Sequence, residues 1–388
     1  MIKKVPFCKV VCDGNELKYI TEVIESGWLT TASKTTEFEK LFSKYVESKY
    51  ACAVNSCTAA LHLGLEALGV QRGDKVFVPS LTFTASAEVI RYLGADPVFL
   101  DVDYDTKLIT PEILKQAVEE NPDIKHLILV HYGGHPADLI REKGDGILDI
   151  CRANNIKIIE DAAHAFPAKI GDKFVGNIGD VTCFSFYANK TITSGEGGML
   201  TTNNEDIYKR VKTMRLHGIN RDVWDRFTSD KPSWEYDVVA PGFKYNMPDV
   251  TAAIGLAQLE RAEDLRLGRQ KAVELYYKHL SGLDMVDLSK NTVPFEDHAW
   301  HLFTIVLNEK SKIGRNKFIE KLSEKGIGTS VHYKPVHLMT YYKEKYGVQS
   351  ALSNTEKIWN GTVTLPLFPS MTEEEVIYVC DTIKEILK

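Results

Sequence analysis

Three side chains that can do chemistry lie at or just after the predicted ends of two buried strands. The run Lys157-Ile-Ile-Glu-Asp161 is apolar and ends in carboxylates, and Val181–Phe186 is a second apolar run. Ser185 stands near the end of that second run, and Lys190 follows it in the next loop. Sheets of parallel strands bind ligands at the carboxyl ends of their strands. We therefore expect an acid, a hydroxyl and an amine at one edge of a sheet.

This set of groups matches the needs of pyridoxal phosphate: a lysine for a Schiff base, a carboxylate beside the ring nitrogen, and donors for the phosphate. Asp161 suits the second task because an adjacent anion keeps the ring nitrogen protonated. Glu160 is its neighbour, but side chains alternate along a strand, so one of the two faces the ring; we assign Asp161. Most lysines are solvated, whereas Lys190 follows a buried strand and precedes a Gly-rich turn. Ser185 is the expected phosphate donor.

A helix amino terminus is the second expected source of phosphate donors. The run Val54-Asn-Ser-Cys-Thr-Ala-Ala60 reads as a strand, a small polar turn and the start of a helix. We expect the amides near Cys57, Thr58 and Ala59 to face the phosphate, and a capping role for Ser56 or Thr58 is compatible with that. Phe83 follows the next strand and can stack on the cofactor ring, although an aromatic there more often packs in a core.

The elements that position these groups alternate between short apolar runs and helical patterns from about residue 50 to 200. This rhythm predicts an α/β domain with a mainly parallel sheet and helices on both faces. After Asp249 the pattern changes to a long helix over Asp249–Leu280 and then a smaller α+β unit. We predict a large domain over residues 1–247 and a small one over 248–388. The expected strands of the two units are Ala51–Val54, Lys75–Pro79, Pro97–Asp101, His126–His131, Lys157–Glu160, Val181–Phe186, Gly198–Thr202, Leu302–Leu307 and Gly328–His332.

Composition narrows the function classes. The 388 residues carry a net charge of −6 without a block of like charge, which gives no reason to expect nucleic acid as a partner. No secretory signal opens the sequence, and no apolar run approaches the roughly 18 residues of a membrane helix, so we expect no membrane contact. Seven scattered cysteines without a C-x-x-C pair indicate reduced thiols in a cytoplasm. His131 and His135 have a metal-like spacing, but the two glycines between them argue against a metal site.

Eight segments resemble the DegT-type nucleotide-sugar aminotransferases, members of the fold type I (aspartate aminotransferase-like) class of pyridoxal-phosphate transferases. They run almost end to end, and SFYANKTITSGEGGM (185–199) and EDAAHA (160–165) are the most specific. The resemblance implies Lys190 as the Schiff-base lysine, pyridoxamine phosphate as the intermediate form of the cofactor, and glutamate as the usual amino donor. It also implies a homodimer whose subunits share each active site. The remaining segments are 27–39, 55–69, 79–86, 242–260, 326–338 and 365–375.

The same resemblance assigns further residues. It places Trp28, His332 and Tyr333 in the substrate pocket, whereas His164 either packs beside the cofactor or supports the site through a hydrogen bond one step removed from it. In many relatives an asparagine in the segment 242–247 reaches the partner's cofactor phosphate. Here Lys244 takes that place and Asn246 comes two positions later, so either can make the contact.

The Lys-Tyr-Asn pattern is similar to the UDP-4-amino-4-deoxyarabinose aminotransferases. This favours amination at C-4 of a nucleotide-linked keto sugar, for deoxyamino sugars of lipopolysaccharide or another surface glycan. Cys57 also departs from the family pattern, since relatives often have glycine at this position. Two rival functions stay open: the sugar dehydratases of this family, which replace the Schiff-base lysine by histidine, and a cofactor-binding regulator without turnover. Three isolated arginines can bind the diphosphate of the nucleotide, namely Arg215, Arg221 and Arg226. Isolated arginines are more often structural.

Overall fold

A large mixed sheet forms the centre of the protein. The computed structural model describes residues 4–220, 236–347 and 352–388. Within them, a seven-stranded sheet has the order β1-β9-β8-β5-β4-β2-β3. Only β9 of this sheet runs antiparallel to its neighbours. This confirms the predicted α/β class with a mainly parallel sheet. Its strands are β1 (Tyr50–Val54), β2 (Lys75–Pro79), β3 (Asp96–Leu100), β4 (His126–Val130), β5 (Lys157–Asp161), β8 (Val181–Ser185) and β9 (Gly198–Thr202).

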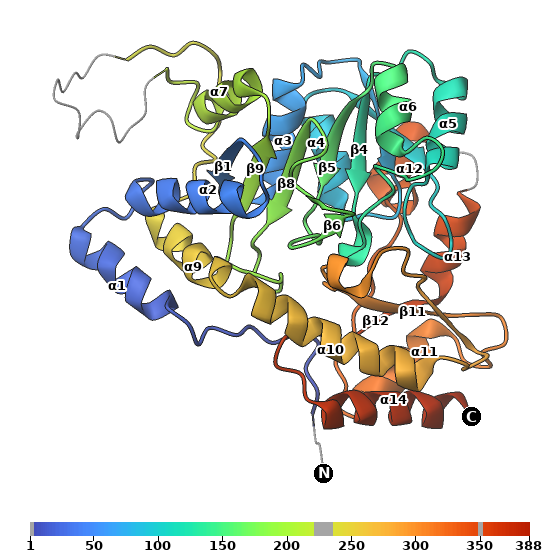
Figure 1. Cartoon of the computed structure of the whole chain (residues 1–388). Coiled ribbons are helices and arrows are strands. Elements are labelled where there is room, and N and C mark those ends of the chain that lie inside the picture. The colour runs from blue at the N-terminus through green and yellow to red at the C-terminus, as the bar shows by residue number, and fades with distance from the viewer. Residues whose placement is uncertain (1–3, 221–235, 348–351) are drawn as a thin grey trace.

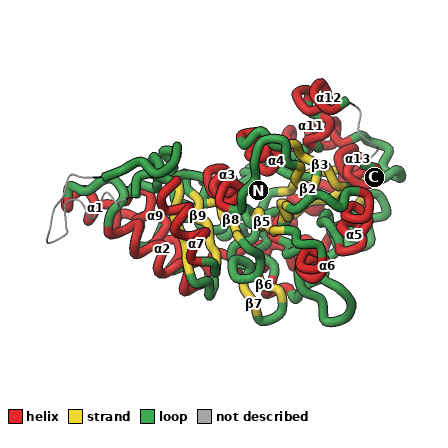
Figure 2. Tube along the Cα trace, turned by 90° about the horizontal axis from the view of Figure 1, so that it is seen from above, coloured by secondary structure: helices red, strands yellow, loops and turns green. Residues whose placement is uncertain are grey.

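Helices cover both faces of this sheet because the strands are apolar on both sides. Along β1, Cys52 and Val54 pack with α3 (Cys57–Ala67), α4 (Thr84–Tyr92) and α7 (Glu205–Met214). Ala51 and Ala53 face the other way, toward α2 (Ser33–Tyr45). Farther along the sheet, that second face is covered by α5 (Pro111–Glu120) and α6 (Ile147–Ala153). Figure 2 shows the row of strands with α3 and α4 on one side and α5 and α6 on the other.

A second, smaller core lies below the large sheet in Figure 1. It is built on the antiparallel sheet of β10 (Val286–Leu288), β11 (Phe303–Leu307) and β12 (Thr362–Leu365). The apolar faces of α10 (Ala262–Leu280), α11 (Arg315–Glu324) and α14 (Glu373–Leu387) pack on it, together with Val5 from the start of the chain. The remaining elements are β6 (Lys169–Ile170), β7 (Lys173–Phe174), α12 (Thr340–Tyr346), α13 (Ser353–Gly361) and the 3₁₀ turns η1 (Tyr132–Gly134), η2 (Phe295–Asp297) and η3 (Val336–Leu338).

The segment between the two cores differs from the single long helix that the sequence predicts. The pattern over residues 249–280 forms two helices, α9 (Asp249–Leu259) and α10, which are separated at Glu260 and Arg261. The first of these packs beside α1 (Glu16–Ser26) and α2. Asp249 is buried and accepts hydrogen bonds from the Ala32 and Thr35 amides at 2.7 and 3.0 Å, which caps the first turn of α2. Since a buried carboxylate must be satisfied by donors, this cap fixes α9 against the large sheet.

A second predicted element is also absent. The run Gly328–His332 forms no strand: among the described residues its one β-bridge joins Ser330 to Thr364 of β12, and Gly328 adds a single hydrogen bond to the Val5 carbonyl at 2.9 Å. The boundary proposed after Met247 stays a prediction. Among the described residues, no helix is long and apolar enough to cross a membrane.

Candidate active site

A cavity of about 350 Å³ opens at the carboxyl ends of β5 and β8 and at the turn after β1. It brings together nine of the residues that the sequence singles out. Those nine are Cys57, Thr58, Phe83, Asp161, His164, Ser185, Lys190, His332 and Tyr333. Strand ends supply most of them, as expected for a parallel sheet.

Asp161 ends β5 and its carboxyl group is held in one orientation. Oδ2 accepts a hydrogen bond from the Ser86 hydroxyl at 2.7 Å, and Oδ1 accepts one from the Ala163 amide at 3.1 Å. Burial raises the pKa of Asp161, whereas these two hydrogen bonds and the nearby Lys190 favour the ionised form. An anion fixed in a desolvated site is the group that can hold a proton on a ring nitrogen.

Glu160, the alternative carboxylate, is fully engaged elsewhere. Its Oε1 accepts from the Gly179 amide at 2.7 Å and from the Thr182 hydroxyl at 2.8 Å, while Oε2 lies 2.9 Å from His131 Nε2. The Ala137 amide donates to His131 Nδ1, so the neutral ring carries its proton on Nε2 and donates it to Glu160. Glu160 is therefore a structural acceptor and does not line the cavity.

Lys190 lies in the loop that follows β8, with its amine buried in the cavity. The turn is closed by the Lys190 amide, which donates to the Tyr187 carbonyl at 3.0 Å. Burial lowers the pKa of the amine to about 8, although Cys57 and Asp161 favour its charged form. Because burial destabilises an ammonium group, about a tenth of this lysine is a neutral nucleophile at pH 7.

The turn before α3 presents donors for an anion. Ser56 caps the helix by accepting from the Ala59 amide at 3.1 Å, so Ala59 is already bonded and does not line the cavity. The amides of Cys57 and Thr58, in the first helical turn, have no intrahelical acceptor. Gly198 permits this arrangement, since a Cβ there would lie 2.6 Å from the Cys57 nitrogen. With Ser185 on the same cavity, these groups fit a phosphate.

His164 and Tyr333 form a hydrogen-bonded pair on the opposite wall. The Gly133 amide donates to His164 Nδ1 at 3.2 Å, and burial lowers the pKa of His164 well below its ordinary value. The neutral ring thus carries its proton on Nε2, which lies 3.0 Å from the Tyr333 hydroxyl. Tyr333 accepts that proton, so its own O–H is free to donate into the cavity. Phe83 lies 5.9 Å from the Tyr333 ring and is 57% exposed, so it lies at the cavity rim and not in a core.

Other predicted residues do not reach this cavity in the single chain. The chain at Lys244 and Asn246 pairs beside the end of β1, but the Lys244 amine bonds the Asn246 side chain, which in turn donates to Thr31 at 2.7 Å. Trp28 lies half-buried between α1 and α2. Arg215 is buried and donates to the Ala53 carbonyl at 2.7 Å, a structural role. Arg221 and Arg226 are outside the described residues.

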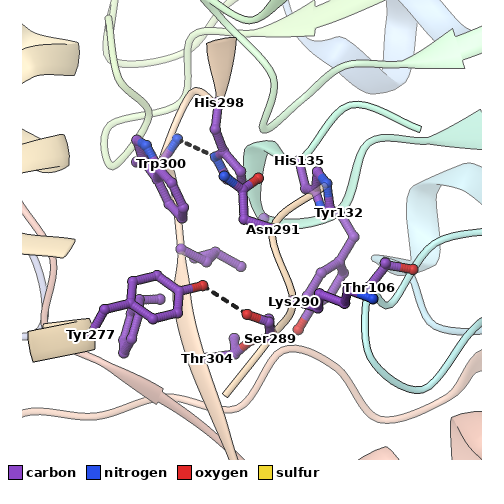
Figure 3. Close-up of a pocket in the computed structure, with 13 residues that line it drawn as sticks. Thr106, Tyr132, His135, Tyr277, Ser289, Lys290, Asn291, His298, Trp300 and Thr304 are labelled. Carbon is purple, nitrogen blue, oxygen red and sulfur yellow. Dashed lines mark hydrogen bonds between the residues drawn. The ribbon is translucent and has the colours of Figure 1, made fainter. Parts of the chain in front are cut away.

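A second cavity lies where η1 meets the small sheet (Figure 3). Its volume is about 30 Å³, enough for one or two water molecules and too small for a sugar. Tyr277 points toward Ser289 and donates to its carbonyl at 2.7 Å. His135 lies on this wall, and its Nε2 is 2.8 Å from the Thr292 hydroxyl. No group of three or more metal-binding side chains occurs in the described part of the chain.

Sequence reasoning missed several groups of the site. The cavity is also lined by Tyr187, Asn189, Glu196 and Gly197, which lie around Lys190. Ser86 ends the segment 79–86, which resembles the family, but nothing in the sequence links it to Asp161, 75 residues away. Of these groups, only Asn189 and its neighbours could be found from the sequence, because they lie in the same loop as Lys190.

A half-buried lysine that lines the cavity, a buried carboxyl group one strand away and free amides at a helix amino terminus define a pyridoxal-phosphate-dependent enzyme of fold type I. A model of the DegT/DnrJ/EryC1/StrS aminotransferase family matches residues 11–384. The chain belongs to this family and is an aminotransferase that uses pyridoxal phosphate, with pyridoxamine phosphate as the alternate cofactor form.

Individual relatives cover nearly the whole chain. Protein MJ1066 of Methanocaldococcus jannaschii is 42% identical over 97% of this chain and 96% of its own. The spore coat polysaccharide biosynthesis protein SpsC of Bacillus subtilis is 39% identical over 99% and 97%. The putative sugar aminotransferase Spr1654 of Streptococcus pneumoniae, in its PMP form, has a TM-score of 0.88 at 32% identity and 99% coverage of both chains. Its PLP form has a TM-score of 0.86.

Proposed function

We propose that this aminotransferase moves an amino group from glutamate to a keto sugar carried on a nucleotide, at C-4 of the sugar. The observation that carries the proposal is Lys190 in one cavity with Asp161 and the anion-binding turn. The similarity to Spr1654 and SpsC supports a sugar as the acceptor. The Lys244-Tyr-Asn246 pattern supports C-4. We place the reaction in the cytoplasm and its product in a surface glycan such as lipopolysaccharide.

The bound cofactor supplies an electron sink for the substrate carbon that loses or gains a proton. Lys190, neutral for part of the time at neutral pH, is the base that removes that proton and the acid that returns it. Asp161, fixed by Ser86, keeps the ring nitrogen protonated. The free O–H of Tyr333 donates to an oxygen that enters the cavity, and His164 orients it.

The substrate assignment is tested by offering a panel of nucleotide-linked keto sugars to the enzyme with glutamate. Mass spectrometry of the products distinguishes the three candidate functions. An aminotransferase replaces the keto oxygen by an amino group, a dehydratase removes water without adding nitrogen, and a regulator leaves every sugar unchanged. Fragmentation of the aminated product locates the nitrogen at C-4 or elsewhere. Lys190 argues against the dehydratase, because that branch has histidine at this position.

We further propose a homodimer in which Lys244 or Asn246 contacts the cofactor phosphate of the partner subunit. The support is an open cavity rim, where Phe83 and Tyr187 are 57% and 49% exposed, and exposed apolar side chains on and beside α1, namely Leu17, Ile24 and Leu29. Such surfaces are typical of interaction sites.

The shared site is tested by coexpressing two defective chains. One carries Lys190→Ala, and the other carries Lys244→Ala with Asn246→Ala. If the contact crosses the interface, a mixed dimer has one doubly defective site and one intact site, so activity appears that neither parent has. If every mixture is as inactive as its parents, the segment serves its own chain and the shared site is refuted.

A further inference from the structure

A buried arginine lies against the base of the Lys190 loop and, among the described residues, has no carboxylate partner. Arg269 lies on α10 and is 3% exposed. In the described residues it has no ion pair with Asp or Glu, and its Nε is buried without a hydrogen-bond partner. Burial lowers the pKa of Arg269 to about 10. A buried charge without a charged partner costs several kcal/mol of folding free energy. We therefore expect Arg269 to have a role that offsets this cost.

The guanidinium group bonds only to main-chain carbonyls. Nη1 donates to His301 at 3.2 Å and to Leu367 at 3.1 Å, and Nη2 donates to Asn189 at 3.2 Å. The first two carbonyls flank β11 and β12 of the small sheet, whereas Asn189 is the residue directly before Lys190. One planar group therefore connects the loop of the reactive lysine to the small sheet. The rigid fork of an arginine suits this task better than a lysine would.

The charge of Arg269 also acts on the Lys190 amine. Burial and Arg269 both disfavour the ammonium form, whereas Cys57 and Asp161 favour it. The pKa values of His164 and His301 are lowered well below the ordinary value by burial, and that of His332 is lowered to about 4, so these rings are neutral at pH 7. Arg269 is thus a permanent cation among neutral rings. The titratable groups that face Lys190 are Cys57 of α3, Asp161 of β5, Arg269 of α10, and the loop residues His164, His301 and His332.

We propose that Arg269 is a positioning residue for Lys190. Its guanidinium hydrogen-bonds the main chain directly before the lysine, and its positive charge adds to burial in favouring the neutral form of the amine, which attacks the cofactor. In that step the amine nitrogen bonds to the aldehyde carbon, and the aldehyde oxygen leaves as water with both amine protons. The inference rests on the proposed function only for the role of Lys190, and not for the identity of the sugar.

The test measures cofactor attachment without any sugar. The full-length chain is freed of cofactor and mixed with pyridoxal phosphate over a range of pH, and the visible absorption of the Schiff base is followed in time. The free cofactor ionises in the same way with every variant. A difference between variants in the pH midpoint of cofactor attachment therefore reflects a change in the protein. We compare Arg269→Gln, Arg269→Lys and Arg266→Gln. Arg266 is the matched control, since it is 4% exposed on the same helix but pairs with Glu263.

Wild-type attachment is expected to accelerate as the pH rises through about 8. Arg269→Gln removes the cation, and we expect its midpoint to rise by roughly half a unit or more, which slows attachment at pH 7 about threefold. Arg269→Lys loses the fork, and burial favours the neutral form of its amine, so we expect cofactor affinity to fall and the midpoint to lie between those of the wild type and Arg269→Gln. Arg266→Gln keeps the wild-type midpoint.

Two results overturn the proposal. One is an Arg269→Gln midpoint equal to the wild type, because a purely structural role lowers stability without moving that midpoint. The other is an Arg266→Gln midpoint that rises as far as that of Arg269→Gln, because the effect is then not specific to the cation beside the Lys190 loop. Thermal unfolding is measured in parallel, and Arg269→Met provides the neutral variant if Arg269→Gln does not fold. The test uses no sugar, so its result does not depend on whether the proposed keto sugar is the substrate.

Discussion

Exchanging Asp161 for asparagine tests the centre of the mechanism with little change of shape. The asparagine can still accept from the Ala163 amide and donate to Ser86, so we expect the free energy of unfolding to change by less than about 1 kcal/mol. What is lost is the negative charge beside the ring nitrogen. Removing one partner of a buried ion pair costs on the order of 3 kcal/mol, which slows the chemical step about a hundredfold.

The assay is the half-reaction of the cofactor-loaded enzyme with glutamate, followed by the loss of visible absorption, with thermal unfolding measured alongside. Glu160→Gln is the matched control, one residue away and fully buried. The glutamine cannot accept from Gly179, Thr182 and His131 together, because its amide group would face a donor. We expect it to lose about 1–3 kcal/mol of stability and to retain its rate per folded molecule. A fast Asp161→Asn beside an inactive, stable Glu160→Gln would refute the assignment.

Further predictions concern the same cavity. Lys190→Ala should purify without the visible absorption of the internal Schiff base and show no turnover; a variant that kept both would contradict the role of Lys190. Ser86→Ala removes one hydrogen bond to the Asp161 carboxylate, so we expect the glutamate half-reaction to slow about tenfold with unchanged folding, as stopped-flow absorbance would show. Because the neutral amine is the reactive form, attachment of the cofactor should accelerate nearly tenfold per pH unit below the Lys190 pKa of about 8 and level off above it; a flat profile from pH 6 to 9 would contradict this.

The sequence predicts the large sheet well because each strand is a local signal. The bounds of β2 and β9 are the predicted ones, and β5 and β8 differ by one residue. The small core is predicted less well. The break at Glu260 between α9 and α10 has no glycine or proline to mark it, and the run Gly328–His332 has strand-like residues but pairs only at Ser330. In both places tertiary packing overrides local preference.

The sequence likewise predicts only part of the candidate site, for a physical reason. The groups that we propose contact the cofactor lie at or just after strand ends and at one helix start, so motif and period place them together. Their orientation depends on contacts between distant segments: Ser86 is 75 residues from Asp161, and Arg269 is 80 residues from Asn189. No period or motif in a single sequence links such pairs. A lysine can therefore be recognised from its loop, whereas the pKa that makes it a nucleophile depends on burial and on a charge from another part of the fold. If Arg269 adds to burial in lowering that pKa, then part of the reactivity of Lys190 depends on how α10 packs, and changes to α10 can alter the chemistry without touching the cavity.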